Sequence, residues 1–187
     1  MTKRSLAYLT GAALCFIAAI FLLVQAGLPE RAEDTASINA EGNRVAPEVG
    51  FLAPSFTARS VSGDTITLDD LRGQTVILNF WATWCGPCRV EMPELQQLYD
   101  LHENDGLRIV AVNLAETEAD VLAWRDTFDL TFELVLDPEQ TLARRYAFRD
   151  PPSTFIIAPD GSISHIFFGP VSEEHLRTAI NQFLPEV

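Results

Sequence analysis

The chain has 187 residues, 48% of them hydrophobic, so it is long enough to bury one hydrophobic core of ordinary size. Its formal net charge of −13 argues against a nucleic-acid partner and for a well-solvated surface. Of the cysteines Cys15, Cys85 and Cys88, the first lies in an apolar N-terminal run, so a framework of several disulfides is excluded.

Residues 1–28 have the pattern of a membrane anchor. Lys3 and Arg4 precede the uncharged run Leu6–Val24, which is long enough to cross a hydrocarbon core of ~30 Å at ~1.5 Å per residue. Basic residues before the run and acidic residues after it predict a cytoplasmic N-terminus and an exported remainder. A cleaved signal peptide is the alternative, because Val24-Gln25-Ala26 resembles a small-residue cleavage site. The length of the apolar run favours an uncleaved anchor, and both interpretations export the domain.

The next segment, residues 29–47, is polar and charged and shows no sustained periodicity. This composition predicts a flexible linker. The folded domain is therefore expected over residues 48–187.

A β-hairpin and a buried strand are the first elements expected in this domain. Residues 54–68 alternate apolar and polar side chains around a Ser62-Gly63-Asp64 turn, which is typical of an antiparallel hairpin. Asp69–Gly73 predicts a short helical turn that ends at glycine. Val76–Phe80 is almost continuously apolar, as expected of a strand that is covered on both faces.

Alternating helices and strands are predicted from Cys85 onward. A helix with the apolar stripe Val90, Met92, Leu95, Leu98, Tyr99 and Leu101 ends near Asn104-Asp105-Gly106. Four elements follow: a strand at Leu107–Leu114, a helix capped by Thr117 and Asp120, a strand at Phe132–Leu136 and a helix opened by Asp137-Pro138-Glu139. Short connections between these elements predict parallel strands joined by right-handed crossovers.

The last elements predict an antiparallel ending to the sheet. Ser153–Ile157 and Ile163–Phe168 flank a Pro159-Asp160-Gly161-Ser162 turn, which indicates a hairpin. Ser172 is expected to cap a final amphipathic helix. The predicted fold class is α/β, with a central mixed β-sheet and helices on both faces.

Cys85 and Cys88 stand at the start of the first long helix, and this placement predicts redox chemistry. Free backbone N–H groups and the positive end of the helix dipole favour a thiolate there. Cys85 is expected to be the exposed nucleophile that attacks a substrate disulfide, and Cys88 the shielded thiol that resolves the mixed disulfide. Gly86 lets the turn form, and Pro87 stiffens it.

A zinc site would be another use of two cysteines at this spacing. Zinc needs four ligands, and His102, His165 and His175 are scattered over different predicted elements. We therefore expect no metal, and no cofactor besides a redox-active Cys85–Cys88 disulfide.

The segment Trp84-Cys85-Gly86-Pro87-Cys88 between a strand and a helix resembles thioredoxin. Pro93 falls at the kink of the active-site helix, and the Pro151–Phe155 run falls where that fold carries its cis-proline. The chain also resembles the membrane-anchored TlpA/ResA/CcmG (DsbE) family, over about residues 48–185. Three features carry this resemblance: the run Asn79–Pro93, the extra strand-helix unit between Leu107 and Tyr146, and the N-terminal anchor. The resemblance implies a thioredoxin-like thiol-disulfide oxidoreductase.

Glu91 is the expected proton relay of this site. It lies three residues after Cys88 on the same helix, where burial would raise its pKa. An exposed glutamate without a function is the alternative, but in the resembling family a glutamate at this position tunes the cysteines. Thioredoxin has a buried aspartate where this chain has Asn79, which cannot titrate, and this difference favours Glu91.

The resemblance also implies a substrate-binding surface made of Trp84, Gly86, Pro87, Pro151 and Pro152. Pro152 is the expected cis-proline opposite the cysteines. Pro151 removes one backbone N–H that a bound peptide would otherwise use.

The direction of electron flow is inferred from the Gly86-Pro87 pair between the cysteines. This pair matches thioredoxin, a reductant with a reduction potential of about −270 mV, and not the oxidant DsbA, whose potential is about −120 mV. The resemblance implies a reductant of apocytochrome c heme-site cysteines, itself reduced by a membrane electron donor of the thiol-transferring type. The expected location is the bacterial inner membrane, held by a single N-terminal helix, with the catalytic domain facing the periplasm or extracytoplasmic side.

Three other functions stay open. The chain is also compatible with a reductant for a copper-protein or oxidase assembly factor, with a general periplasmic disulfide reductase, and with a non-catalytic binding module. A peroxidase is conceivable, but its usual Pro-x-x-x-Thr-x-x-Cys pattern is absent around Cys85.

Overall fold

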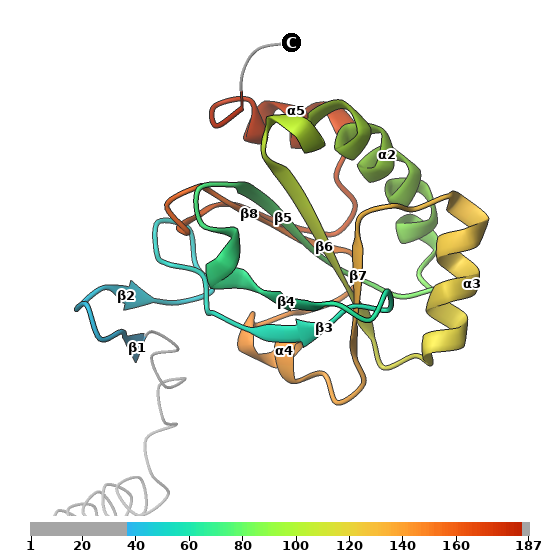
Figure 1. The fold of residues 1–187 in the computed structure, drawn as a ribbon, viewed down its shortest axis with the longest axis horizontal. Coiled ribbons are helices and arrows are strands. Elements are labelled where there is room, and N and C mark those ends of the chain that lie inside the picture. The colour runs from blue at the N-terminus through green and yellow to red at the C-terminus, as the bar shows by residue number, and fades with distance from the viewer. Residues whose placement is uncertain (1–36, 185–187) are drawn as a thin grey trace, which may run out of the picture. The chain divides into compact units, whose positions relative to one another are not determined.

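The computed structural model describes residues 37–184, which are built around a mixed five-stranded sheet (Figure 1). The strand order is β7-β6-β5-β8-β9. Strands β5 (Thr75–Trp81), β6 (Leu107–Leu114) and β7 (Glu133–Asp137) are parallel to one another. Strand β8 (Ser153–Ile157) runs antiparallel to β5, and β9 (Ile163–Phe168) runs antiparallel to β8. The predicted α/β class with a mixed sheet is confirmed.

Helices cover both faces of this sheet (Figure 1). The helices α2 (Gly86–His102), α3 (Glu118–Phe128) and α5 (Glu173–Ile180) pack on one face, and α4 (Thr141–Arg145) packs on the other. All seven residues of β5 are buried, because alternate side chains enter the two cores. Ile77 and Trp81 point to the α2 side, whereas Leu78 and Phe80 point to the α4 side.

The hairpin predicted before the central strand is present. Strands β3 (Thr57–Arg59) and β4 (Thr65–Thr67) pair antiparallel, and Gly63 supplies the positive φ of +100° at their turn. The short 3₁₀ helix η1 (Leu68–Leu71) follows, and Gly73 has a φ of +84° after it.

Part of the segment predicted as an irregular linker is regular. Strands β1 (Ser37–Ile38) and β2 (Arg44–Val45) pair antiparallel, and the Asn39 side chain accepts a hydrogen bond from the Asn43 N–H at 2.8 Å. Leu52 N–H donates to the Arg44 carbonyl at 3.2 Å, so this hairpin is tied to the domain. The strands are too short for a periodic pattern, which explains the wrong prediction for these residues.

The apolar stripe of α2 differs from the prediction at two positions. Val90 and Leu101 are 66% and 58% exposed. The helical period instead turns Cys88, Glu91, Met92, Leu95 and Leu98 toward the sheet, because residues three and four apart share a face. A 3₁₀ turn, η2 (Glu103–Asp105), and Gly106 end the helix as expected.

Helix α4 begins later than the Asp137-Pro138-Glu139 signal predicts. Gln140 has a left-handed φ of +53°, which separates Pro138 from the helix. The Asp137 carboxylate accepts hydrogen bonds from the N–H groups of Leu142 and Ala143 at 3.2 and 2.8 Å. Asp137 therefore caps the helix from the end of β7 and does not start it.

The remaining predicted elements are found. Thr117 and Asp120 form the capping box of α3, and the Ser172 side chain caps α5. The predicted anchor or signal sequence, residues 1–28, lies outside the described residues. Within residues 37–184, no helix combines the length and the hydrophobicity needed to cross a membrane.

Candidate active site

The Cys85–Cys88 pair lies where β5 passes into α2. Cys85 is the N-cap residue of α2, and its Sγ accepts a hydrogen bond from the Cys88 N–H at 3.2 Å. The two cysteines form a disulfide, with their Cα atoms 5.3 Å apart. Pro87 occupies the first turn of α2, where a missing N–H costs no helical hydrogen bond. The helix N-terminus therefore donates a hydrogen bond to the Cys85 sulfur.

In this oxidised state Cys85 is buried, contrary to the prediction of an exposed nucleophile. Cys85 is 4% exposed and Cys88 is 1% exposed. The disulfide to Cys88 and the hydrogen bond from the Cys88 N–H hold the Cys85 sulfur against the first turn of α2. The exposed residues of the motif are its neighbours, above all Trp84 at 68%.

Glu91 belongs to a buried polar cluster beneath the motif. Its Oε1 accepts hydrogen bonds from Thr154 Oγ1 at 3.1 Å and from Asn79 Nδ2 at 3.3 Å. Asn79 Nδ2 also donates to Thr154 Oγ1 at 2.9 Å. The pairing of Asn79 with Thr154 across β5 and β8 places both side chains under α2. Glu91 Oε2 has no hydrogen-bond partner among the described residues.

Burial is the main cause of an altered acidity at Glu91. Removal from water raises the pKa of Glu91 from its ordinary value of 4.5 to about 7. The Thr154 hydrogen bond opposes this rise in pKa, whereas the nearby negative charge of Glu94 adds to it. The burial that the sequence predicts for Glu91 is confirmed, and the pKa shift has the expected direction. A carboxyl group with this pKa exchanges protons readily near neutral pH.

An apolar groove adjoins the motif. Its volume is about 370 Å³, and its lining residues are Pro87, Val90, Glu91, Glu94, Pro170, Val171 and Ser172. Glu91 thus connects the buried cluster to a surface that a polypeptide can reach. The exposed Val90, which the sequence assigned to the core, forms part of this wall.

The predicted proline pair lies at the same end of the sheet. The Pro151–Pro152 peptide bond is cis, as the sequence predicts. Ser153 pairs with Phe80 near the end of β5, so Pro152 precedes β8 at the end where β5 leads into the motif. The Pro152 carbonyl accepts a hydrogen bond from the Gly169 N–H at 2.9 Å.

Sequence reasoning missed a second polar cluster beside the motif, made of Thr83, Asn113 and Glu116. The Glu116 carboxylate accepts hydrogen bonds from the Thr83 N–H and the Asn113 Nδ2, each at 2.7 Å, and from the Thr83 hydroxyl. No local pattern marks Glu116, because only the pairing of β5 with β6 brings it to Thr83.

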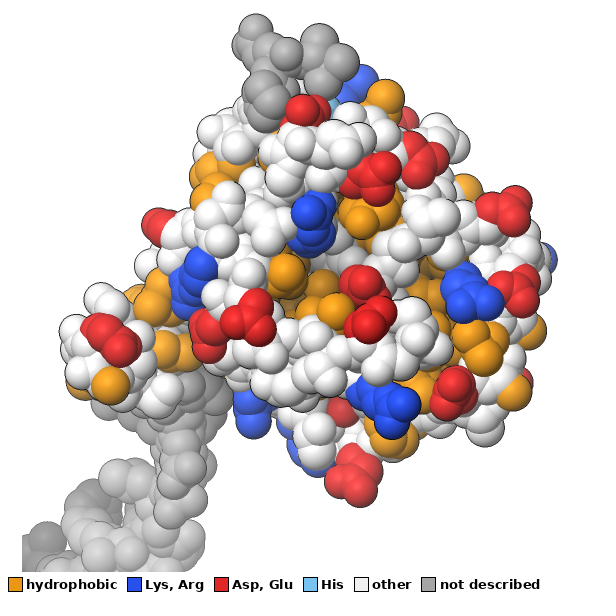
Figure 2. Space-filling view, in the orientation of Figure 1, with side chains coloured by type: hydrophobic (Ala, Val, Ile, Leu, Met, Phe, Trp, Pro, Cys, Tyr) orange, Lys and Arg blue, Asp and Glu red, His pale blue; other side chains and the backbone are white. Residues whose placement is uncertain are grey.

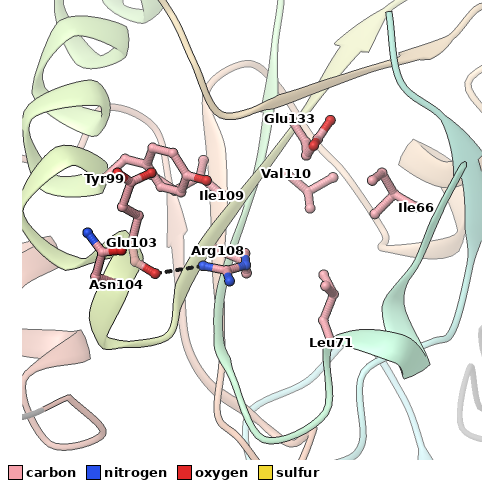
Figure 3. Close-up of a pocket in the computed structure, with 9 residues that line it drawn as sticks. All are labelled: Ile66, Leu71, Tyr99, Glu103, Asn104, Arg108, Ile109, Val110 and Glu133. Carbon is pink, nitrogen blue, oxygen red and sulfur yellow. Dashed lines mark hydrogen bonds between the residues drawn. The ribbon is translucent and has the colours of Figure 1, made fainter. Parts of the chain in front are cut away.

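A separate groove lies away from the motif (Figure 3). It has a volume of about 380 Å³ and lies between the C-terminal part of α2, β6 and the β4–η1 segment. Its polar residues include Tyr99, Glu103, Arg108 and Glu133, and Arg108 donates to the Glu103 carbonyl at 2.8 Å. None of the predicted site residues lines this groove.

Acidic and basic side chains are interspersed on the face drawn in Figure 2. Within residues 37–184, no three His, Cys, Asp or Glu side chains are grouped so that they could hold a metal ion.

Known proteins are similar to this chain in fold and in sequence. The model of the AhpC/TSA family matches residues 49–166. The chain belongs to this thioredoxin-like family. Thiol-disulfide oxidoreductase ResA from Geobacillus thermodenitrificans is 34% identical over 142 residues, which cover 76% of this chain and 82% of the relative. ResA from Oceanobacillus iheyensis is 39% identical over 142 residues, covering 74% of each chain.

Solved structures of family members agree with these relatives. StoA from Bacillus subtilis superimposes with a TM-score of 0.61 at 31% identity, covering 68% of this chain and 97% of StoA. A Chlorobium tepidum protein described as thiol:disulfide interchange protein DsbE gives a TM-score of 0.67 at 30% identity, covering 71% and 95% of the two chains. The chain is a thiol-disulfide oxidoreductase of the ResA and DsbE type, and the predicted family and enzyme class are confirmed.

Proposed function

We propose that this oxidoreductase is an exported reductant of protein disulfides, with apocytochrome c as its substrate. The observation that carries a reductive mechanism is the buried Glu91. This residue lies about one helical turn after Cys88 on α2, and its pKa is about 7. A resolving thiol must lose its proton before it attacks, and Glu91 can accept a proton near neutral pH. The relatives named ResA support the choice of reaction.

The reaction begins with the reduced pair. The Cys85 thiolate, favoured by the α2 N-terminus, attacks one sulfur of the substrate disulfide. A Cys85–substrate disulfide forms, and the other substrate sulfur leaves as a thiolate that takes up a proton. Cys88 then gives its proton to Glu91 and attacks Cys85 Sγ. The second substrate sulfur leaves as a thiolate that takes up a proton, and two electrons have passed from the cysteines to the substrate.

The substrate polypeptide is proposed to lie across the apolar groove beside the motif. Trp84 and Pro87 are exposed next to the cysteines. The space beside Gly86 is open, because no atom lies within 4 Å of the position that a Cβ would take there. Pro151 and Pro152, which precede β8 at the same end of the sheet, would contact the polypeptide outside this groove. Catalytic roles for Cys85, Cys88 and Glu91 and binding roles for these five residues are parts of the same proposal.

The proposal also includes export. Residues 1–28 would remain as an uncleaved anchor in the bacterial inner membrane, and the domain over residues 48–187 would face the periplasm. A membrane electron donor of the thiol-transferring type would return the Cys85–Cys88 disulfide to two thiols. The mass of the mature protein tests the anchor, because cleavage after Ala26 would remove the apolar run.

A trapping experiment tests the substrate. In Cys88→Ser the mixed disulfide on Cys85 cannot be resolved, so the partner stays attached and mass spectrometry identifies it. We expect apocytochrome c, whereas a copper-protein assembly factor or a broad set of proteins would support one of the alternative substrates. The double variant Cys85→Ser/Cys88→Ser is the control and should trap nothing.

A redox titration tests the direction of electron flow. A reductant should have a potential close to that of thioredoxin, about −270 mV. A value near or above that of DsbA, about −120 mV, would refute the reductive role. Full biological activity of Cys85→Ser would instead favour a non-catalytic binding module.

A further inference from the structure

We propose that Glu116 is a positioning residue of the thiol-disulfide exchange, which holds the turn before Cys85 in the geometry that brings the two cysteines together. Glu116 does not contact either sulfur in the described structure. It acts through Thr83, two residues before Cys85. The inference rests on the role of Cys85 and Cys88 given under Proposed function.

The hydrogen bonds of Glu116 fix both the backbone and the side chain of Thr83. Oε2 accepts from the Thr83 N–H at 2.7 Å, and Oε1 accepts from the Thr83 hydroxyl. Hydrogen bonds to an ionised acceptor are stronger than bonds between neutral groups. Thr83 lies inside the turn closed by the Cys85 N–H and the Ala82 carbonyl at 3.2 Å. Its position therefore sets the direction in which the chain enters Cys85.

The carboxylate is itself fixed to the central sheet. Asn113 Nδ2 donates to Glu116 Oε2 at 2.7 Å, and Asn113 is fully buried in β6, paired with Trp81 of β5. Ala115 has a φ of +58°, which turns the chain after β6 so that Glu116 reaches Thr83. This conformation is unfavourable for alanine, so the fold keeps it against a local cost.

Clamping the turn should favour the disulfide over the dithiol. When the cysteines are reduced, no covalent bond holds Cys85 near Cys88, and the hydrogen bonds at Thr83 then limit the drift of Cys85. Loss of these bonds lets the reduced state gain conformational freedom, whereas the disulfide keeps its own geometry. The equilibrium should shift toward the dithiol.

The glutathione equilibrium measures this effect. The reduced protein and glutathione disulfide exchange to give the Cys85–Cys88 disulfide and two molecules of glutathione, so that two electrons pass to glutathione. For Glu116→Ala we expect the equilibrium constant of this reaction to fall about tenfold. The matched control is Glu118→Ala, which removes an exposed carboxylate two residues away and should leave the equilibrium constant unchanged.

Glu116→Gln separates hydrogen bonding from charge. The Gln carbonyl oxygen can accept from the Thr83 N–H and from Asn113, while its NH₂ group donates to the Thr83 hydroxyl, which can act as an acceptor. All three contacts are thereby kept without the charge. We expect Glu116→Gln to restore the equilibrium constant to within about threefold of the wild-type value.

Three results would overturn the proposal. The first is an equilibrium constant for Glu116→Ala equal to that of Glu118→Ala. The second is a Glu116→Gln variant as impaired as Glu116→Ala. The third is a lower urea midpoint for Glu116→Ala with an unchanged equilibrium constant, which would mean a purely structural role. A different partner in the trapping experiment would refute the proposed substrate without altering any of these equilibria.

Discussion

Replacing Glu91 with glutamine should remove a large part of the pH dependence of stability. Glu91 is 3% exposed, and its pKa rises from 4.5 to about 7 in the folded protein. A raised pKa means that the folded state holds the proton more tightly than the unfolded state. The stabilisation is therefore fully present below about pH 4.5 and is lost as the pH rises through about 7. At ~1.4 kcal/mol per pKa unit, the loss is on the order of 3 kcal/mol.

Urea unfolding of the oxidised protein between pH 4.5 and 8 measures this loss. The disulfide keeps Cys85 and Cys88 from titrating, so wild type and Glu91→Gln differ in one titratable group. We expect the wild-type free energy of unfolding to fall on the order of 3 kcal/mol more than that of Glu91→Gln. Glu103→Gln, which removes an exposed carboxylate just after α2, should behave as wild type. Parallel curves for wild type and Glu91→Gln would refute the buried, proton-holding role.

Three further predictions follow from single contacts. Thr154→Val removes the hydroxyl that donates to Glu91, so the Glu91 titration midpoint should move above 7 in the same unfolding series; a lower midpoint would contradict the assigned hydrogen bond. Leu98→Ala should lower the free energy of unfolding by about 2–5 kcal/mol, because Leu98 is fully buried. Leu101→Ala, at an exposed position of the same helix, should change it by less than about 0.5 kcal/mol. Equal losses of stability in urea unfolding would contradict the orientation of α2. Trp84→Ala should leave the free energy of unfolding almost unchanged, because Trp84 is exposed. It should slow the reduction of a protein disulfide more than the reduction of glutathione disulfide. Equal slowing of both reactions in stopped-flow assays would argue against a contact between Trp84 and the polypeptide.

Much of the fold could be predicted because its signals are local. Strand β6 was predicted with its observed bounds, since an apolar run between turn residues needs no knowledge of its neighbours. The caps at Thr117 and Ser172 are also read within four residues of sequence. Where the signal was weak, prediction failed: the strands at Ser37–Ile38 and Arg44–Val45 are only two residues long.

The local sequence predicted the redox pair and its place at a helix N-terminus, and together with the family resemblance it favoured Glu91 as the proton relay. The surroundings of Glu91 depend on the tertiary structure, because Asn79 and Thr154 reach it from two different strands. The tertiary structure also decided that Cys85 is covered in the disulfide and that Glu116 holds Thr83. Burial and hydrogen bonding at these atoms depend on strand register between segments up to 75 residues apart, which no local pattern encodes.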